Sequence, residues 1–287
     1  LPVGVLALAT APFFVPESGG RERPRLDFGG VVLLSIALAG LVVPLSMGRE
    51  QHWDVWIVGP LVASPVFAAW FYLFERRYTR RGGLPLLQAS LLRIRSFRLG
   101  LVVALLFFFT SPFYLFFSFF LQAGVGEGPL AAGLAVLPYG IANFLGPMCA
   151  TRVPAVYRPW LFGGGMAIEV LGYAAVALCA ATVTTNWVLY AILFAAGFGQ
   201  GVAMPEMINT ILGEIPDEHT GLAAGTMNST LQLGAAISIA AIGSLFFVVL
   251  GNGTTVADYG RALGISMAAQ VVALAGSLLL GLVAARR

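Results

Sequence analysis

Two carboxylic acids in this sequence lie deep inside apolar segments, where an ionised side chain is costly. Glu169 lies just beyond the glycines at 163–165, and Glu206 directly follows Pro205. An acid inside a membrane is a functional candidate by default, because it can attract a cation or exchange a proton. Glu206 lies about 9 Å from the end of its predicted helix at Leu212. A structural hydrogen bond to a neighbouring helix is the alternative for both acids, and we favour it for Glu169.

Uncharged polar side chains in or near the apolar segments form a second group of candidates. Amide and hydroxyl groups can hold a small molecule, but polar side chains also join helices to one another in membranes. Helix packing is the stronger interpretation for any single one of them. The candidates are Gln122, Tyr139, Asn143, Gln200, Asn209, Asn228 and Gln232.

An aromatic run between Phe107 and Phe120 offers a third kind of surface. Its phenylalanines and one tyrosine could form an apolar binding wall that also attracts cations through their ring faces. Phenylalanine occurs on every side of the predicted helix, so part of the run is also expected to face lipid.

The sequence gives little support for chemistry that requires a lysine, a reactive thiol or a bound metal ion. All 16 basic residues are arginine, so the sequence contains neither a phosphate-loop lysine nor a Schiff-base lysine. Cys149 and Cys179 lie within apolar segments, which favours buried free thiols over a disulfide. His52 and His219 are too isolated for a metal site or a catalytic triad. We therefore expect no cofactor, no enzymatic activity and no nucleic-acid partner.

The composition indicates which environment surrounds these residues. Of the 287 residues, 59% are hydrophobic and 10% are charged, whereas soluble domains contain about 25% charged residues. A helix that crosses a hydrocarbon core of about 30 Å needs about 20 mostly apolar residues. By that criterion the sequence predicts an all-α integral membrane protein, with a partial span at 1–16 followed by eight full spans. The full spans lie near 28–48, 54–74, 98–122, 129–151, 160–182, 187–212, 221–250 and 259–285.

The arginines between these spans predict the orientation in the membrane. If the spans alternate in direction, fourteen arginines fall on one side, and only Arg49 and Arg261 fall on the other. Positive residues accumulate on the cytoplasmic side, so we expect a multi-pass protein of the cell (plasma or inner) membrane with a cytoplasmic C-terminus. The connection from Glu75 to Arg98 holds seven of the arginines around several leucines. This pattern predicts either an amphipathic helix on the bilayer surface or a plain solvated linker.

Several short motifs follow one another at characteristic spacings along nearly the whole chain. They are Leu1-Pro2-Val3-Gly4, Leu26-Asp27-Phe28-Gly29-Gly30, Arg95-Ser96-Phe97-Arg98, Phe120-Leu121-Gln122, Gly128-Pro129-Leu130, Leu137-Pro138, Gly197-Phe198-Gly199-Gln200-Gly201, Gly221-Leu222-Ala223-Ala224-Gly225 and Gln232-Leu233-Gly234. In this order they resemble spans six to thirteen of the fourteen-span drug:proton antiporters of the major facilitator type, the EmrB/QacA branch.

The resemblance implies a major facilitator-type helical bundle that is only partly present. It would divide the chain into the tail of span six (1–16), two central extra helices (17–75), a cytoplasmic Arg-rich linker (76–97) and the C-terminal six-helix bundle (98–287). It implies proton-coupled efflux of cationic or amphipathic small molecules by alternating access, together with a missing N-terminal bundle. The stretch from Arg152 to Arg158 departs from the family pattern, because it keeps the arginines but lacks an acid.

Other functions fit the sequence less well. A permease for a metabolite or a lipid would share the same spans and polar candidates. A non-transporting membrane subunit or a channel is the alternative from another class, and the polar face of a six-span bundle speaks against it.

Overall fold

The computed structural model describes residues 10, 28–47, 54–80, 91–180, 187–216 and 219–285, and helices without strands make up almost all of that part of the chain. The partial span predicted at 1–16 and most of the leucine-rich linker lie outside these residues. The helices are α2 (Phe28–Met47), α3 (Val55–Arg80), α4 (Arg95–Phe107), α5 (Phe113–Phe119), α6 (Pro129–Ala150), α7 (Arg158–Cys179), α8 (Trp187–Leu212), α9 (Thr220–Leu250) and α10 (Val256–Ala285).

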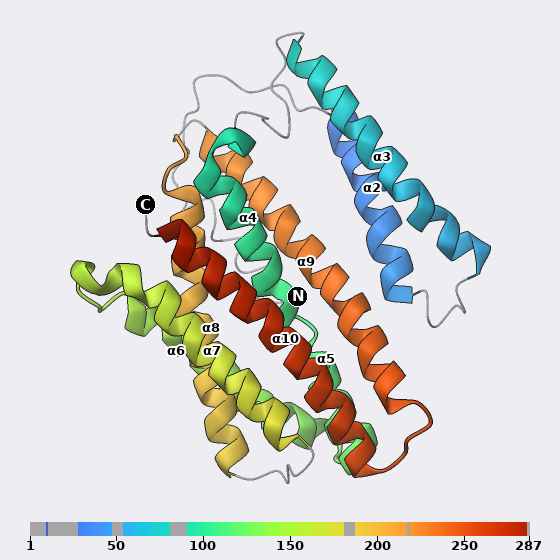
Figure 1. The fold of residues 1–287 in the computed structure, drawn as a ribbon, viewed down its shortest axis with the longest axis vertical. Helices are drawn as coiled ribbons and strands as arrows, with labels where there is room; N and C mark the ends of the chain where they lie inside the picture. Colours follow the sequence, from blue (N-terminus) through green and yellow to red (C-terminus); the bar gives the residue numbers. More distant parts are fainter. Residues whose placement is uncertain are drawn as a thin grey trace.

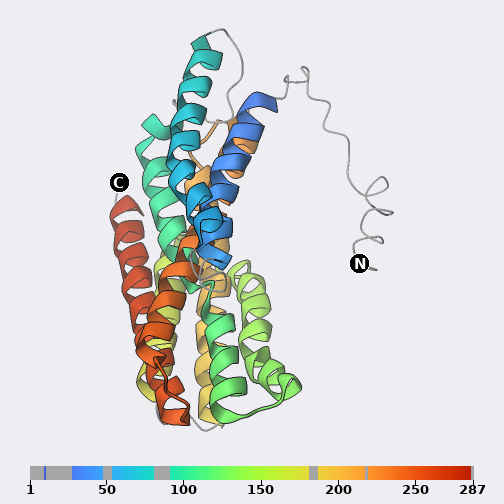
Figure 2. The same ribbon diagram turned by 90° about the vertical axis from the view of Figure 1, so that its right-hand side faces the viewer.

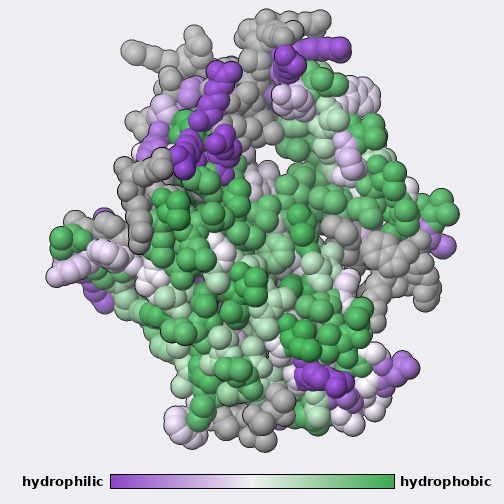
Figure 3. Space-filling view, viewed as in Figure 1, coloured by the Kyte–Doolittle hydropathy of each residue, from purple (hydrophilic) through white to green (hydrophobic). Residues whose placement is uncertain are grey.

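The helices agree closely with the spans predicted from hydropathy. Seven helical segments of the described chain are long and apolar enough to cross a membrane, and one of them runs from Arg95 to Val125 through α4 and α5. The eighth predicted span is α2, whose apolar stretch, Gly29–Pro44, is shorter. Large apolar side chains point outward along these helices. Leu178, for example, is 84% exposed and Leu130 is 78% exposed. Figure 3 shows apolar side chains over most of the middle of the molecule, with polar ones gathered mainly towards its ends. This is the surface expected of a protein surrounded by lipid.

Helices α4 to α10 form one elongated bundle, and α2 and α3 pack as a pair beside it (Figure 1). Figure 2 shows that most helices run along the long axis of the molecule. Within the bundle, α8 packs on both α6 and α7, while α10 packs on α4, α7 and α9. The pair joins the bundle through contacts between α2 and α9.

Glycines let the backbones of α6, α7 and α8 approach very closely. A Cβ atom added at Gly146 would lie 2.8 Å from backbone atoms at Gly201 and Val202, and one at Gly165 would lie 2.8 Å from the Gly199 carbonyl oxygen. Such separations are shorter than real Cβ contacts, so only glycine fits. Small residues of this kind are typical of membrane helix interfaces, where close backbone packing replaces the hydrophobic effect.

The span from Arg95 to Val125 is interrupted near its middle. Helix α4 ends at Phe107, and a 3₁₀ turn (Phe108–Thr110) and Pro112 separate it from α5. Side chains from other helices satisfy backbone groups near this break. Ser238 of α9 donates a 2.8 Å hydrogen bond to the Phe109 carbonyl, and Ser277 of α10 donates a 2.9 Å bond to that of Val103. A broken helix is tolerated within a membrane when neighbouring helices satisfy the freed groups in this way.

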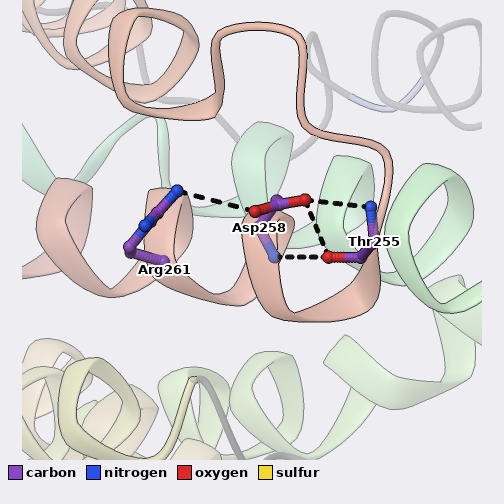
Figure 4. A network of polar contacts seen from close by, with 3 residues as sticks. All are labelled: Thr255, Asp258 and Arg261. Atoms are coloured by element: carbon purple, nitrogen blue, oxygen red, sulfur yellow. Dashed lines mark hydrogen bonds and ion pairs between the residues drawn. The ribbon is translucent and has the colours of Figure 1, made fainter.

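The start of α10 is fixed by a local network (Figure 4). The Asp258 carboxylate accepts hydrogen bonds from the Thr255 hydroxyl at 2.7 Å and the Thr255 amide at 3.2 Å. In return, the Asp258 amide donates to the Thr255 hydroxyl at 3.2 Å, which completes a reciprocal helix cap. Arg261 lies 3.5 Å from the same carboxylate. This arginine, one of the two predicted on the outer side, therefore helps to define a helix end.

Candidate functional site

Polar side chains from several helices meet at the break between α4 and α5. Asn143 of α6 donates a 2.8 Å hydrogen bond to the side-chain oxygen of Gln200 on α8. Gln200 in turn lies 3.3 Å from the hydroxyl of Thr110, in the 3₁₀ turn, and donates to it. The Thr110 hydroxyl donates to the carbonyl of Phe107, one turn earlier. The break is therefore tied through side chains to both α6 and α8.

Three tyrosines continue this network into the bundle. The hydroxyls of Tyr139 on α6 and Tyr173 on α7 lie 3.4 Å apart, and both side chains are almost fully buried. Tyr173 also reaches the Thr110 side chain, and Tyr114 of α5 reaches that of Tyr139. The ring of Phe113 packs against the rings of Tyr139 and Tyr173, with centroid distances of 5.4 Å and 5.2 Å.

Glu169 lies one turn before Tyr173 on α7, and its charge would act on all three tyrosines. The side chain is 0% exposed, and neither carboxylate oxygen has a hydrogen-bond partner among the described residues. Among the described residues, the structure thus shows no partner for the structural hydrogen bond that we favoured for Glu169. The helix is closely packed there, since a Cβ atom at Gly199 of α8 would lie 2.6 Å from the backbone nitrogen of Glu169.

We refer to these residues together as the mid-bundle polar cluster. It consists of Thr110, Tyr114, Tyr139, Asn143, Glu169, Tyr173 and Gln200. Tyr114 is 43% exposed, and Asn143 and Gln200 are partly exposed, so the cluster runs from the bundle surface to the buried acid. A chain of hydroxyl and amide groups with an acid at its inner end can hold a polar ligand or pass a proton from group to group.

The other candidates from the sequence lie away from this cluster. Gln122 is exposed and donates a 2.6 Å hydrogen bond to Ser118 on its own helix. Asn228 and Gln232 are exposed one turn apart on α9, as a polar stripe. Glu206 is half-buried on α8, six residues beyond Gln200. The structure therefore brings together four of the eight leading candidates.

Sequence reasoning missed Thr110 and Tyr173, and it also missed Gln270 on α10. Gln270 is 1% exposed and its side-chain oxygen has no partner among the described residues. Ser277 contacts α4 at Val103, and Tyr259 packs on Gly124, so α10 runs antiparallel to the span that contains the break. Seven residues before Ser277, Gln270 therefore lies near the level of the break. The available signal was the spacing of Ser266, Gln270 and Ser277 within an apolar segment, because steps of four and seven residues place them on one face of a helix.

The described residues contain no group of three or more histidines, cysteines and acids that could hold a metal ion. The site is thus built from hydroxyls, amides and one buried carboxyl group, enclosed by helices of membrane-spanning length. A bundle of this kind defines a polytopic membrane protein with a polar centre, which is the general form of a helical transporter.

Comparison with known proteins identifies the family. The sequence profile of the Major Facilitator Superfamily matches residues 5–239. A protein of Streptomyces coelicolor named as a probable actinorhodin transporter is 31% identical over 260 residues, which cover 89% of this chain and 45% of that protein. The chain belongs to the Major Facilitator Superfamily, a family of multi-pass membrane transporters rather than enzymes.

Two further relatives have names that refer to drug resistance. Methyl viologen resistance protein SmvA of Salmonella typhimurium is 25% identical over 247 residues, covering 85% of this chain and 49% of that protein. Multidrug resistance protein Stp of Mycobacterium tuberculosis is 25% identical over 248 residues, which cover 85% of this chain and 45% of that protein. The chain spans about half the length of these relatives. The family match and the names of the relatives confirm the resemblance to the drug-efflux branch of the superfamily.

Proposed function

We propose that this chain is the C-terminal portion of a proton-coupled efflux transporter for small molecules, working by alternating access. Its bundle would rock against an N-terminal bundle around a site near the membrane midplane. The names of the relatives support a small-molecule cargo, and the shares of their lengths support a partner half. The observation that carries the proposal is the Glu169 carboxyl group at the inner end of a polar chain, where no described residue forms a hydrogen bond with it.

Glu169 has the properties required of a proton-coupling group. A fully buried ionised carboxylate is costly unless it is paired, and the oxygens of Glu169 have no hydrogen-bond partner among the described residues. Protonation in the arrangement seen here and release in another would therefore link the charge of Glu169 to the conformation of the bundle. The surrounding tyrosine hydroxyls would carry the proton between the acid and the partly exposed Tyr114.

The break between α4 and α5 supports the conformational part of the proposal. Gln200 and Ser238 contact this break from two different helices. A rearrangement at Glu169 would reach it through Tyr173 and Thr110. The two half-helices could then change their angle without loss of their internal hydrogen bonds.

Aromatic side chains near the surface of α5 suggest the chemistry of the cargo. Phe119 is 39% exposed and packs edge-on against Phe247 of α9, with ring centroids 5.8 Å apart. Tyr114, of the polar cluster, is also exposed, five residues earlier on the same helix. Such a surface suits planar aromatic and amphipathic molecules, and its ring faces also attract cations. The names of two relatives, which mention actinorhodin and methyl viologen, are consistent with this class.

The arginine distribution supports a cytoplasmic C-terminus and a location in the cell membrane. The C-terminal end of α3 and the N-terminal ends of α4 and α9 would then lie on the cytoplasmic side. In this orientation Asp258 and Arg261 would lie at the outer surface.

The test is transport by the protein extended to the length of its relatives and reconstituted in liposomes. Glu169→Gln removes the exchangeable proton but keeps the size and hydrogen-bonding atoms of the side chain. We expect it to abolish transport driven by a pH gradient, while downhill substrate exchange continues. Glu127→Gln, at an acid in the loop before α6, is the matched control and should behave as the unmodified protein.

Two results would overturn the assignment in different ways. Normal proton-driven transport by Glu169→Gln together with failure of Glu206→Gln would move the coupling site to α8. Absence of any substrate flux in the unmodified protein, with or without a pH gradient, would instead favour a non-transporting membrane subunit.

A further inference from the structure

A groove of about 470 Å³ lies between α2 and the main bundle, beside the contacts of α2 with α9. Leu34 and Leu38 of α2, Leu101 of α4 and one face of α9 line it. Figure 3 shows the surface hollowed between the main bundle and the α2–α3 pair. The volume falls within the range of about 300–1,000 Å³ that is typical of ligand sites.

The α9 wall of the groove is mostly apolar, although Thr226, Ser229 and Thr230 lie on it. A Cβ atom added at Gly221 or Gly225 would meet nothing within 4 Å, so these two glycines leave an open channel one turn long. Thr226 and Thr230 also line the groove, but their hydroxyls donate to carbonyls of their own helix at 3.0 and 2.9 Å. Because those hydroxyls are already bonded, the threonines offer mainly their methyl groups to an occupant. No charged side chain is among the described lining residues.

The length of the groove matches one leaflet of a membrane. Its α9 wall extends from Gly221, in the first turn of the helix, to Leu233. Twelve residues of helix span about 18 Å, whereas half of a hydrocarbon core is about 15 Å thick. Helices α2, α4 and α9 all begin on the same side of the molecule, so the groove runs from that side towards the midplane.

Arginines precede the groove along α4, towards the side where these helices begin, although they are not among its described lining residues. Arg98 precedes Leu101 by one turn of α4 and is exposed, and Arg95 lies one turn earlier still. Neither forms an ion pair with another residue in the part of the chain that the structure describes. The acid Glu214 is held separately by the hydroxyl of Ser96. A guanidinium group recognises phosphate oxygens through two parallel hydrogen bonds, so the apolar groove and the cation together fit an amphipathic phosphate ester.

We propose that this groove binds a glycerophospholipid of the arginine-rich leaflet, with one acyl chain along α9 and the phosphate at Arg98. The lipid would fill the space between the α2–α3 pair and the transport bundle and so couple the pair to the bundle. This proposal does not depend on proton coupling or on the identity of the cargo.

Photo-crosslinking in the full-length protein tests the occupant directly. A benzophenone amino acid replaces Ser229, which lines the groove, and the protein is irradiated in native membranes and analysed by mass spectrometry. We expect an adduct with the mass of a phospholipid. A crosslink to another segment of the protein or to the transported molecule, or the absence of any adduct, would overturn the proposal.

Two glycine substitutions separate groove occupancy from general disturbance of the protein. Gly225→Leu places a side chain in the channel, at a position where an added Cβ atom would meet nothing within 4 Å. It should lower the yield of the lipid adduct about tenfold, equivalent to about 1.4 kcal/mol of binding. Gly140→Leu makes the same change on α6, also at a position with nothing within 4 Å, and should leave the yield unchanged. Arg98→Gln should also lower the yield of the lipid adduct, because it removes the cation proposed to hold the phosphate. The variant should still elute as a single monodisperse peak in size-exclusion chromatography, which would show that it is folded. Equal yields in Gly225→Leu and Gly140→Leu would contradict a site in this groove.

Discussion

The close contact between α7 and α8 at Glu169 yields a sharp prediction for Gly199→Ala. The added Cβ atom would lie 2.5 Å from the carbonyl oxygen of Gly165 and 2.6 Å from the amide nitrogen of Glu169. Tight Cβ contacts in real proteins begin at 3.0–3.4 Å, so the two helices must separate by about 0.5–0.9 Å. Both obstructing groups are backbone atoms, which cannot rotate out of the way.

Such a separation has an energetic cost that can be compared with a control. Overpacking of this kind costs about 1–3 kcal/mol. Gly140→Ala introduces the same methyl group on α6, where nothing lies within 4 Å, and alanine is favoured over glycine in a helix by up to about 1 kcal/mol. Gly199→Ala should therefore destabilise the protein, and Gly140→Ala should be neutral or slightly stabilising.

The assay is unfolding in detergent micelles, followed by tryptophan fluorescence, for the two variants and the unmodified protein. Proton-driven transport of the full-length variants provides a second measurement, in which Gly199→Ala should lose activity because Glu169 has moved relative to its tyrosines. Equal stability of Gly199→Ala and Gly140→Ala would refute the reasoning, since it would show that α7 and α8 are not in backbone contact at this level.

Three other predictions follow from the same structure. Leucine substitutions at Asn143 and Gln200, singly and together, should show a coupling free energy of about 0.6 kcal/mol and at most about 1.7 kcal/mol in a double-mutant cycle of unfolding measurements; additive effects would contradict their hydrogen bond. Ser238→Ala should lower the free energy of unfolding by about 0.5–1.5 kcal/mol, because it leaves a carbonyl at the helix break without its donor; an unchanged free energy would argue against that bond. In a variant without its native cysteines, a membrane-impermeant maleimide applied to intact cells should label Thr254→Cys but not Arg77→Cys; labelling of both would refute the proposed topology.

Much of this fold could be read from the sequence because a bilayer imposes a simple length requirement on each span. Long apolar stretches bounded by arginines predicted the helices, and the order of short motifs predicted the family. The sequence also singled out Glu169 as an acid within a span, since a charge in apolar sequence is visible without any knowledge of packing. None of these inferences depended on which residues face each other.

The surroundings of Glu169 became visible only in the tertiary structure. From sequence, a peripheral helix with a hydrogen-bonded acid was the favoured interpretation. The structure instead shows a buried carboxyl group that has no hydrogen-bond partner in the part of the chain it describes. Its neighbours Tyr139 and Tyr173 lie 34 residues apart in the chain, and Thr110 becomes available to them only because the helix breaks at that point. Hydropathy reports how strongly a residue avoids water, but not which direction its side chain takes around the helix. That direction is set by the glycines that bring α6, α7 and α8 together, and it is what joins scattered polar residues into one site.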